Sequence, residues 1–140
     1  MFENPTQPEI EAFLRRIRTV AVLGLSDAPG KPSHHVAQGL QKFGYRIVPV
    51  NPTASAILGE KAWPDLESAI RSAGPIDVVQ VFRRPEHVAA IVDDAIRLKV
   101  PALWLQEGVV DAAAAEKARA AGIFTVMDKC MFKTRSAMGA

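Results

Sequence analysis

The 140 residues of the chain, 49% of them hydrophobic and 23% charged, suffice for one globular domain with a buried core and exclude a disordered chain. A net charge of +2 without a lysine- or arginine-rich block excludes a nucleic-acid-binding protein, and no run approaches the roughly 20 apolar residues of a membrane helix. The N-terminus does not resemble a signal peptide and the single cysteine, Cys130, excludes an internal disulfide, so we expect a cytoplasmic protein.

A helix is the first predicted element, within residues 1–18. Thr6 can cap its first turn, Glu9 can reach back to the Thr6 backbone, and Pro8 lies where a helix tolerates proline. Four apolar residues then recur at helical spacing, namely Ile10, Phe13, Leu14 and Ile17. This pattern gives the helix one face to pack against a core.

Five continuous apolar runs predict strands at residues 20–24, 45–50, 78–82, 102–105 and 124–127. Strands that are apolar on both faces are typical of a parallel sheet covered by helices. Helices are predicted between the runs, over residues 34–43, 66–73, 85–98 and 111–121. The last begins at the capping residue Asp111 and ends at Gly122.

This alternation predicts a single Rossmann-like α/β domain over residues 1–140, with five mainly parallel strands, helices on both faces and a tail over 133–140. In such a doubly wound sheet, ligands bind outside the carboxyl ends of the strands. The candidate site therefore consists of the segments that follow the strands, residues 24–33, 51–53, 82–85, 106–108 and 128–130.

The loop after the first strand fits neither of two common nucleotide-binding motifs. Only Gly24 of the G-x-G-x-x-G fingerprint is present, and Asn51 follows the second strand, where an NAD enzyme usually offers a carboxylate to the ribose. The stretch from Gly24 to Lys31 has one residue too many for a P-loop, and Pro32 replaces the magnesium-binding serine or threonine. Ordinary NAD binding and a Walker NTPase are both disfavoured.

The same loop nevertheless suits an anionic ligand. Gly24 and Gly30 permit a tight backbone, Ser26 and Ser33 supply hydroxyl groups, and Lys31 supplies a positive charge. The loop runs into a helix, whose first N–H groups and dipole favour phosphate. Taken singly, Ser33 could be only a helix cap and Lys31 only a solvated cation, but the combination favours anion binding.

The remaining reactive side chains predict neither a catalytic centre nor a metal site. His34 and His35 are adjacent and point apart, and His87 belongs to another helix, so a metal site is disfavoured. Cys130 has two open interpretations. It is either a small buried packing residue or a thiol at the ligand edge of the sheet, where Lys129 favours the thiolate.

Short motifs at successive strand ends together resemble a known family. They are VLGLS at 22–26, KPS at 31–33, VPVNP at 48–52, VFRRPE at 81–86, WLQEG at 104–108 and DKC at 128–130. From residue 20 to 130 the chain is similar to the small stand-alone CoA-binding proteins, which resemble the N-terminal CoA-binding domain of the succinyl-CoA synthetase α subunit. The resemblance implies a Rossmann-like fold with coenzyme A, or an acyl-CoA, in its crevice.

The resemblance also implies roles for individual residues. It places Gly24, Ser26 and Lys31 near the phosphates, Asn51 and Pro52 beneath the nucleotide, Phe82 and Arg83 beside it, and Gln106 and Gly108 along the pantetheine arm. The side chains fit this ligand independently. Lys31 and Arg83 follow different strands and can converge on the anionic end of CoA, and the planar guanidinium of arginine suits phosphate.

The predicted function is therefore a non-catalytic CoA- or acyl-CoA-binding protein. The phosphorylated histidine of the synthetase lies in a separate later domain that this sequence does not contain, and a fold alone does not imply the ligase reaction. Two alternatives stay open, a CoA-binding subunit of an acyl-CoA ligase or transferase and an NAD- or nucleotide-binding redox sensor. A homo-oligomer or a CoA-enzyme partner is compatible with either role.

Overall fold

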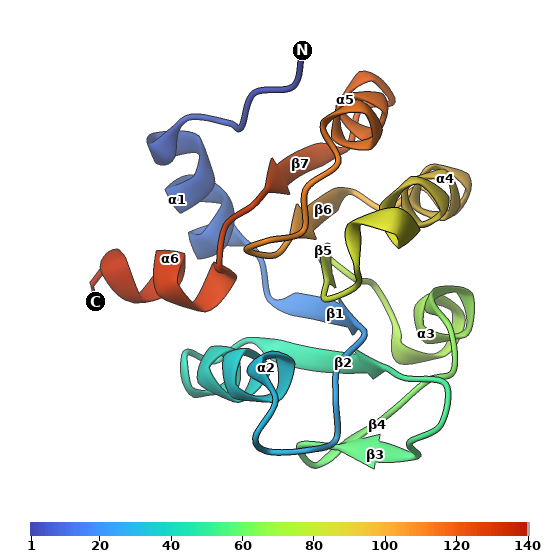
Figure 1. Cartoon of the computed structure of the whole chain (residues 1–140). Helices are drawn as coiled ribbons and strands as arrows, with labels where there is room; N and C mark the ends of the chain where they lie inside the picture. Colours follow the sequence, from blue (N-terminus) through green and yellow to red (C-terminus); the bar gives the residue numbers. More distant parts are fainter. Residues whose placement is uncertain (140) are drawn as a thin grey trace.

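A parallel sheet of five strands runs through the centre of the molecule in the order β2-β1-β5-β6-β7 (Figure 1). The computed structural model describes residues 1–139. The strands are β1 (Thr19–Leu23), β2 (Arg46–Val50), β5 (Val78–Val81), β6 (Ala102–Leu105) and β7 (Phe124–Met127). All four pairings between them are parallel. The predicted Rossmann-like α/β fold is confirmed.

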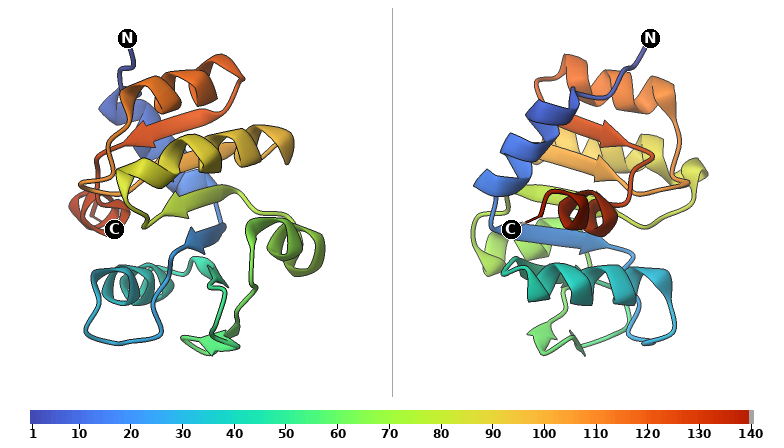
Figure 2. Two further views of the ribbon diagram at one scale, coloured as in Figure 1. Left: turned by 45° about the vertical axis from the view of Figure 1, so that its right-hand side comes forward. Right: turned by 90° about the vertical axis from the view of Figure 1, so that its left-hand side faces the viewer.

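Helices cover both faces of this sheet, as Figure 2 shows from two further sides. One face packs against α1 (Gln7–Arg16), α2 (Pro32–Lys42) and α6 (Met131–Ala137). The other packs against α3 (Leu66–Ala73), α4 (Val88–Arg97) and α5 (Ala112–Ala120), with the short 3-10 helix η1 (Pro85–His87) leading into α4. Within residues 1–139, the helices are too short or too polar to cross a membrane.

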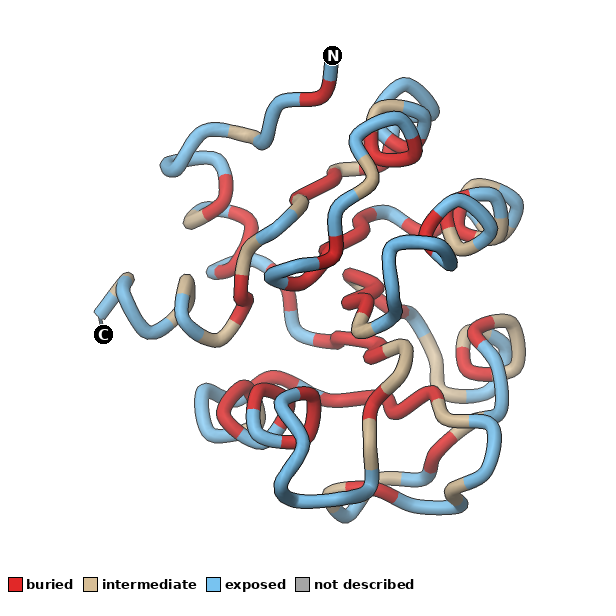
Figure 3. Tube along the Cα trace, in the orientation of Figure 1, coloured by how far each residue is buried: buried red, intermediate tan, exposed pale blue. Residues whose placement is uncertain are grey.

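The strands are buried because both of their faces are apolar. Val20, Ala21 and Val22 of β1 are fully buried; the two valines face α1 and α2, whereas Ala21 faces α3 and α4. Figure 3 shows the same burial along the central strands. Burial on both faces is the property that the continuous apolar runs predicted.

Local capping defines where several helices begin. The Glu9 backbone N–H donates to Thr6 Oγ1 at 3.4 Å, and the Thr6 backbone N–H donates to Glu9 Oε1 at 2.9 Å, which completes the predicted capping box of α1. The Asp65 side chain accepts a hydrogen bond from the Ser68 backbone N–H at the start of α3. At the start of α5, the Asp111 side chain accepts one from the Ala114 backbone N–H. These caps satisfy N–H groups that the helices leave unpaired.

Three regions differ most from the sequence-based expectations, whereas several other elements differ only at their ends. The hairpin of β3 (Ala56–Ile57) and β4 (Glu60–Lys61) was not predicted, and it leads into Trp63, which pairs with the outer side of β2 through Pro49 O and Asn51 N. Helix α2 begins at Pro32, before the predicted residue 34, so Ser33 lies inside the helix and is not its cap. Most of the expected tail over 133–140 belongs to α6, and residue 140 lies outside the described residues.

The N-terminal segment lies along the outer edge of β7. The Asn4 side-chain amide donates to Met127 O at 2.9 Å and accepts from Met127 N at 2.7 Å. Phe2 is buried in the core cluster beside α5. The amide of Asn4 thus pairs with this edge strand much as a neighbouring backbone would.

Candidate functional site

The order of the strands places a crevice between the carboxyl ends of β1 and β5. The chain leaves β1 for α2 on one face of the sheet and leaves β2 for α3 on the other, so the direction of winding reverses at this point. Ligands of doubly wound sheets bind at such a reversal. The five predicted segments meet along this one edge.

Gly24 allows the first loop to leave the sheet at the crevice. Its φ is +83°, and a Cβ added to it would collide with the carbonyl oxygen of Phe82. The Phe82 backbone N–H in turn donates to Leu23 O at 2.8 Å. Only glycine combines this dihedral angle with so close an approach of two backbones. The two backbones therefore meet directly, and the Arg83 side chain lies beside them, with its Cδ 3.0 Å from where a Gly24 Cβ would be.

Side-chain hydrogen bonds hold the loop between Gly24 and α2. Ser33 Oγ accepts from the Ser26 backbone N–H, and Ser26 Oγ accepts from the Ala28 backbone N–H, both at 3.0 Å. Ser33 itself is buried. Both predicted serines thus shape the loop, and whether either hydroxyl also contacts a ligand stays a prediction.

Asn51 joins this loop to the one after β2. Its Nδ2 donates to Leu25 O at 2.9 Å, and its Oδ1 accepts from the backbone N–H groups of Thr53 at 2.8 Å and Ala54 at 2.9 Å. Both ends of the amide are thereby engaged inside the protein. Asn51 supports the candidate site from below, and its predicted place beneath a nucleotide is compatible with that support.

The first turn of α2 offers unpaired donors to the loop. Lys31 is the N-cap residue, and its exposed side chain makes no capping bond. In the described part of the chain, the backbone N–H groups of Ser33 and His34 find no acceptor. Free N–H groups at a helix N-terminus, with a lysine beside them, are suited to a phosphate group.

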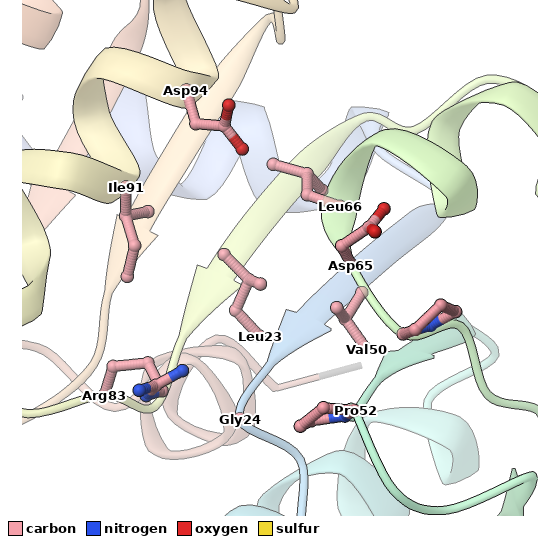
Figure 4. Close-up of a pocket in the computed structure, with 10 residues that line it drawn as sticks. Leu23, Gly24, Val50, Pro52, Asp65, Leu66, Arg83, Ile91 and Asp94 are labelled. Atoms are coloured by element: carbon pink, nitrogen blue, oxygen red, sulfur yellow. The ribbon is translucent and has the colours of Figure 1, made fainter.

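A pocket of about 280 Å³ opens on the α3 and α4 side of the crevice (Figure 4). We call it the α3–α4 pocket, and it is lined by Leu23, Gly24, Val50, Pro52, Pro64, Asp65, Leu66, Arg83, Ile91 and Asp94. In Figure 4 the Arg83 guanidinium lies beside Gly24, whereas Asp94 lies on the opposite side, near Leu66. An apolar floor separates the cation from the carboxylate.

Of the three charged side chains that line the α3–α4 pocket, the two carboxylates already have hydrogen-bond or ion-pair partners inside the protein. The Ser68 backbone N–H and then its hydroxyl, by hydrogen bonding to Asp65, hold the pKa of that carboxyl below its ordinary value. Asp94 accepts from Arg97 at 2.6 Å. Arg83 takes part in none of the ion pairs between described residues. Arg83 is therefore the cation that remains free for an anionic ligand.

A second pocket of about 280 Å³ opens on the α2 and α6 side of the same crevice. We call it the α2–α6 pocket, and it is lined by Pro32, His35, Val36, Phe82, Gln106, Glu107, Cys130 and Lys133. Lys133 Nζ and Glu107 Oε1 form an ion pair of 3.1 Å at its rim. Phe82 and Arg83, neighbours in sequence, thus face different pockets.

Gln106 presents a fixed donor to the α2–α6 pocket. Its Oε1 accepts from Gln80 Nε2 at 3.0 Å and from the Met131 backbone N–H at 3.3 Å, and these bonds set the orientation of the amide. Only 5% of Gln106 is exposed, yet it lines the pocket, and its Nε2 has no acceptor among residues 1–139. Its two N–H groups are available to a ligand.

Gly108 lies outside both pockets. Its backbone N–H donates to Asp128 Oδ1 at 2.8 Å, and Asp128 has a φ of +61°, a strained value for a residue other than glycine. This bond joins the loop after β6 to the end of β7 and so helps to position Gln106. A direct contact between Gly108 and a ligand stays a prediction.

Sequence reasoning missed three groups of pocket residues. Pro64, Asp65 and Leu66 follow the unpredicted hairpin, so no strand end pointed to them. Ile91 and Asp94 project from α4 at i, i+3 spacing, a signal the sequence contains. In the other pocket the missed residues are His35, Val36 and Lys133. The part of the chain from 1 to 139 does not gather three potential metal-ligating side chains.

A family model described as the CoA binding domain matches residues 18–135. The chain belongs to the CoA-binding domain family. All ten residues predicted for the ligand, and Cys130, fall within the matched part of this CoA-binding domain. The resemblance inferred from the strand-end motifs is thereby confirmed at the level of the family.

Several relatives share the whole extent of this CoA-binding domain. It is 39% identical over 129 residues to the uncharacterized protein YneT of Bacillus subtilis, with 92% of this chain and 93% of YneT covered. A solved structure from Thermus thermophilus, cell-free ID.343, is 32% identical with a TM-score of 0.87 and covers 96% and 99% of the two chains. The crystal structure of Prb, the PH1109 protein redesigned for binding, is 28% identical with a TM-score of 0.88 and covers 99% and 95%.

Proposed function

We propose that this protein binds coenzyme A across the carboxyl edge of its sheet, with the nucleotide end on the α3–α4 side and the pantetheine arm on the α2–α6 side. The observation that carries the proposal is the pair of pockets of similar volume, one lined by Gly24 and Arg83 and the other by Phe82, on either side of the close approach between the Gly24 and Phe82 backbones. A long ligand with an anionic end and an amide-containing arm needs two such sites. Membership of the CoA-binding domain family supports the same ligand.

The nucleotide end is matched by the charges around the α3–α4 pocket. Arg83 offers a planar donor set, and Lys31 with the first N–H groups of α2 offers a second anion site across Gly24. Asp65 and Asp94 would repel a phosphate, which therefore belongs on the Gly24 side. Their carboxylate oxygens can instead accept hydrogen bonds from the ribose hydroxyl or adenine amino groups.

The pantetheine arm is matched by the other pocket. Phe82, Val36 and Pro32 supply apolar contacts for its methylene and dimethyl groups, and the Gln106 amide can donate to one of its amide carbonyls. We restrict the function to binding of CoA or acyl-CoA, without catalysis by this chain alone. The carboxylates near the pockets already serve structural purposes, as the cap of α3 and as partners of Arg97 and Lys133.

Isothermal titration calorimetry with CoA, dephospho-CoA and NAD under reducing conditions tests the proposal. We expect CoA to bind tightest and dephospho-CoA, which lacks the 3′-phosphate, to bind about ten- to a hundredfold more weakly. A charge-assisted hydrogen bond contributes roughly 1.5–3 kcal/mol, which corresponds to that ratio. Tighter binding of NAD than of CoA would overturn the assignment.

A further inference from the structure

The only cysteine of the chain lies in the pocket proposed for the pantetheine arm. Cys130 joins β7 to α6, is 6% exposed, and lines the α2–α6 pocket with Phe82 and Val36. Its thiol is free. A buried cysteine is often just a packing residue, so a ligand at this sulfur needs independent evidence.

That evidence is Gln106 in the same pocket, whose Nε2 has no acceptor among the described residues. Gln106 is 5% exposed, and its Oε1 accepts from Met131 N, the backbone group that directly follows Cys130. The hydrogen bond from Met131 N to Gln106 Oε1 therefore links the orientation of the Gln106 amide to the backbone next to Cys130. Because Gln106 lines the pocket and its Nε2 lacks a protein acceptor, a ligand in the pocket can supply one. The last amide carbonyl of pantetheine, a few bonds from its sulfur, is such an acceptor.

The same pocket also holds a cation. The pKa of Lys133 is raised, first by its hydrogen bond to Glu107 and, as the smallest contribution, by the charge of Cys130. Lys133 is the lysine that lines the α2–α6 pocket together with Cys130. Sequence reasoning expected Lys129 to favour the thiolate, but Lys129 does not line that pocket. The thiolate is the form of a cysteine that attacks a disulfide.

We propose that Cys130 is a site of reversible covalent attachment of CoA, formed by thiol–disulfide exchange with oxidised CoA. The Cys130 thiolate attacks one sulfur of the CoA disulfide, a new Cys130–CoA disulfide forms, and the CoA sulfur–sulfur bond breaks. One CoA leaves as a thiolate and takes up a proton. The CoA disulfide is the oxidant, so no other co-reactant is needed, and a cellular thiol reverses the reaction by the same exchange.

This inference rests on the proposed function, because the nucleotide end must bring the disulfide to Cys130. The bound nucleotide raises the effective concentration of the reacting sulfur above its value in solution. The protein would therefore keep CoA covalently when the CoA pool is oxidised and release it when thiols reduce the bond. In a reducing cytosol the adduct would be short-lived.

The experiment follows adduct formation by intact-mass spectrometry with equal concentrations of CoA disulfide or glutathione disulfide. We expect CoA disulfide to modify the wild type about tenfold faster or more, and to leave Cys130→Ser unmodified. Desulfo-CoA, which lacks the thiol, should slow the reaction by occupying the site. Lys133→Gln should slow it severalfold, whereas the matched change Lys129→Gln, outside the pocket, should not.

Equal rates with the two disulfides, or no reaction with either, would overturn the inference. Calorimetry with reduced CoA on Cys130→Ser distinguishes this failure from failure of the proposed function. If the variant binds CoA but the wild type shows no preference for CoA disulfide, only the covalent step is wrong. If reduced CoA fails to bind the wild type as well, the proposed function itself fails.

Discussion

The two pockets at the carboxyl edge of the sheet have similar volumes but different polar groups. The α3–α4 pocket holds a free arginine opposite carboxylates that the fold already uses. The α2–α6 pocket holds an oriented amide and a thiol. The first arrangement is suited to selecting a charged ligand and the second to orienting a neutral arm. Changes on the two sides should therefore have effects of different kinds.

The largest effect is expected at Gly24, where the two pockets meet. Gly24→Ala forces a side chain into a left-handed backbone conformation and against the Phe82 carbonyl. We expect it to lower the free energy of unfolding by about 2–4 kcal/mol and to weaken CoA binding on both sides. Urea denaturation and calorimetry measure the two effects.

Gly30 in the same loop provides the control, because its Cβ would meet nothing within 4 Å. Gly30→Ala should change stability by no more than about 0.5 kcal/mol. Similar losses in both variants would mean that loop flexibility, and not the close approach to Phe82, requires glycine at position 24.

A smaller effect, confined to binding, is expected for Arg83 and Lys31, the cations of the proposed nucleotide end. Arg83→Ala or Lys31→Ala should weaken CoA binding about ten- to a hundredfold and leave stability within about 0.5 kcal/mol. Arg84→Ala removes another exposed arginine that lines neither pocket and should leave the affinity unchanged. If the Arg83 and Lys31 variants bind CoA like the wild type, the nucleotide end lies elsewhere.

A modest, pH-dependent effect on stability is expected at Asp65. Its folded-state pKa is lowered, chiefly by the Ser68 backbone N–H, so its stabilisation is present at neutral pH and is lost as pH falls through the lowered value. Asp65→Asn keeps an acceptor for Ser68 but cannot titrate. Urea midpoints from neutral to strongly acidic pH should therefore converge for the two proteins. A constant difference between them would show that the Asp65 charge does not stabilise α3.

The smallest effect on reversible binding is expected for Cys130→Ser. We expect its affinity for reduced CoA to stay within about threefold of the wild type, because ordering the flexible arm costs entropy that offsets contacts near its end. Calorimetry under reducing conditions measures this ratio. A loss of about tenfold or more would mean that the thiol itself contributes to reversible affinity.

Elements with strong local signals were predictable from the sequence. The bounds of β6, β7 and α3 are those predicted, because apolar runs and capping residues mark their ends. The β3–β4 hairpin was missed because its turn places Leu58 at a φ of +54°, before Gly59 at +78°. Turns of this kind favour asparagine or glycine at the first position, so Leu58 concealed the turn.

Helix α6 was missed because tertiary packing stabilises it more than local sequence does. Its N-cap residue, Cys130, makes no side-chain capping bond. Met131 is fully buried, and the Phe132 ring lies so close to Gly39 of α2 that a Cβ there would collide with it. No sequence pattern within residues 131–137 indicates the contact between Phe132 and Gly39. The pocket that α6 helps to form was therefore missed as well.

The sequence predicted the location of the candidate site better than the roles of its individual side chains. Gly24, Pro52 and Arg83 line one pocket, and Phe82 and Gln106 line the other. The hydrogen bonds that engage Ser26, Ser33 and Asn51 inside the protein depend on how separate loops meet. The bond from Asn51 to Leu25, for example, joins residues 26 positions apart. Local sequence carries little information about such pairs.

The pairing of Asn4 with Met127 has a consequence for self-association. An outer strand with free N–H and C=O groups is a template on which a second chain can add a strand and begin an aggregate. Here a side-chain amide occupies both groups of Met127, and at the opposite margin Trp63 pairs with β2. At each margin of the sheet, a short segment of the same chain thus already pairs with part of the outer strand, at Met127 of β7 and at Pro49 of β2. Replacement of Asn4 by alanine would reopen one margin to intermolecular strand pairing.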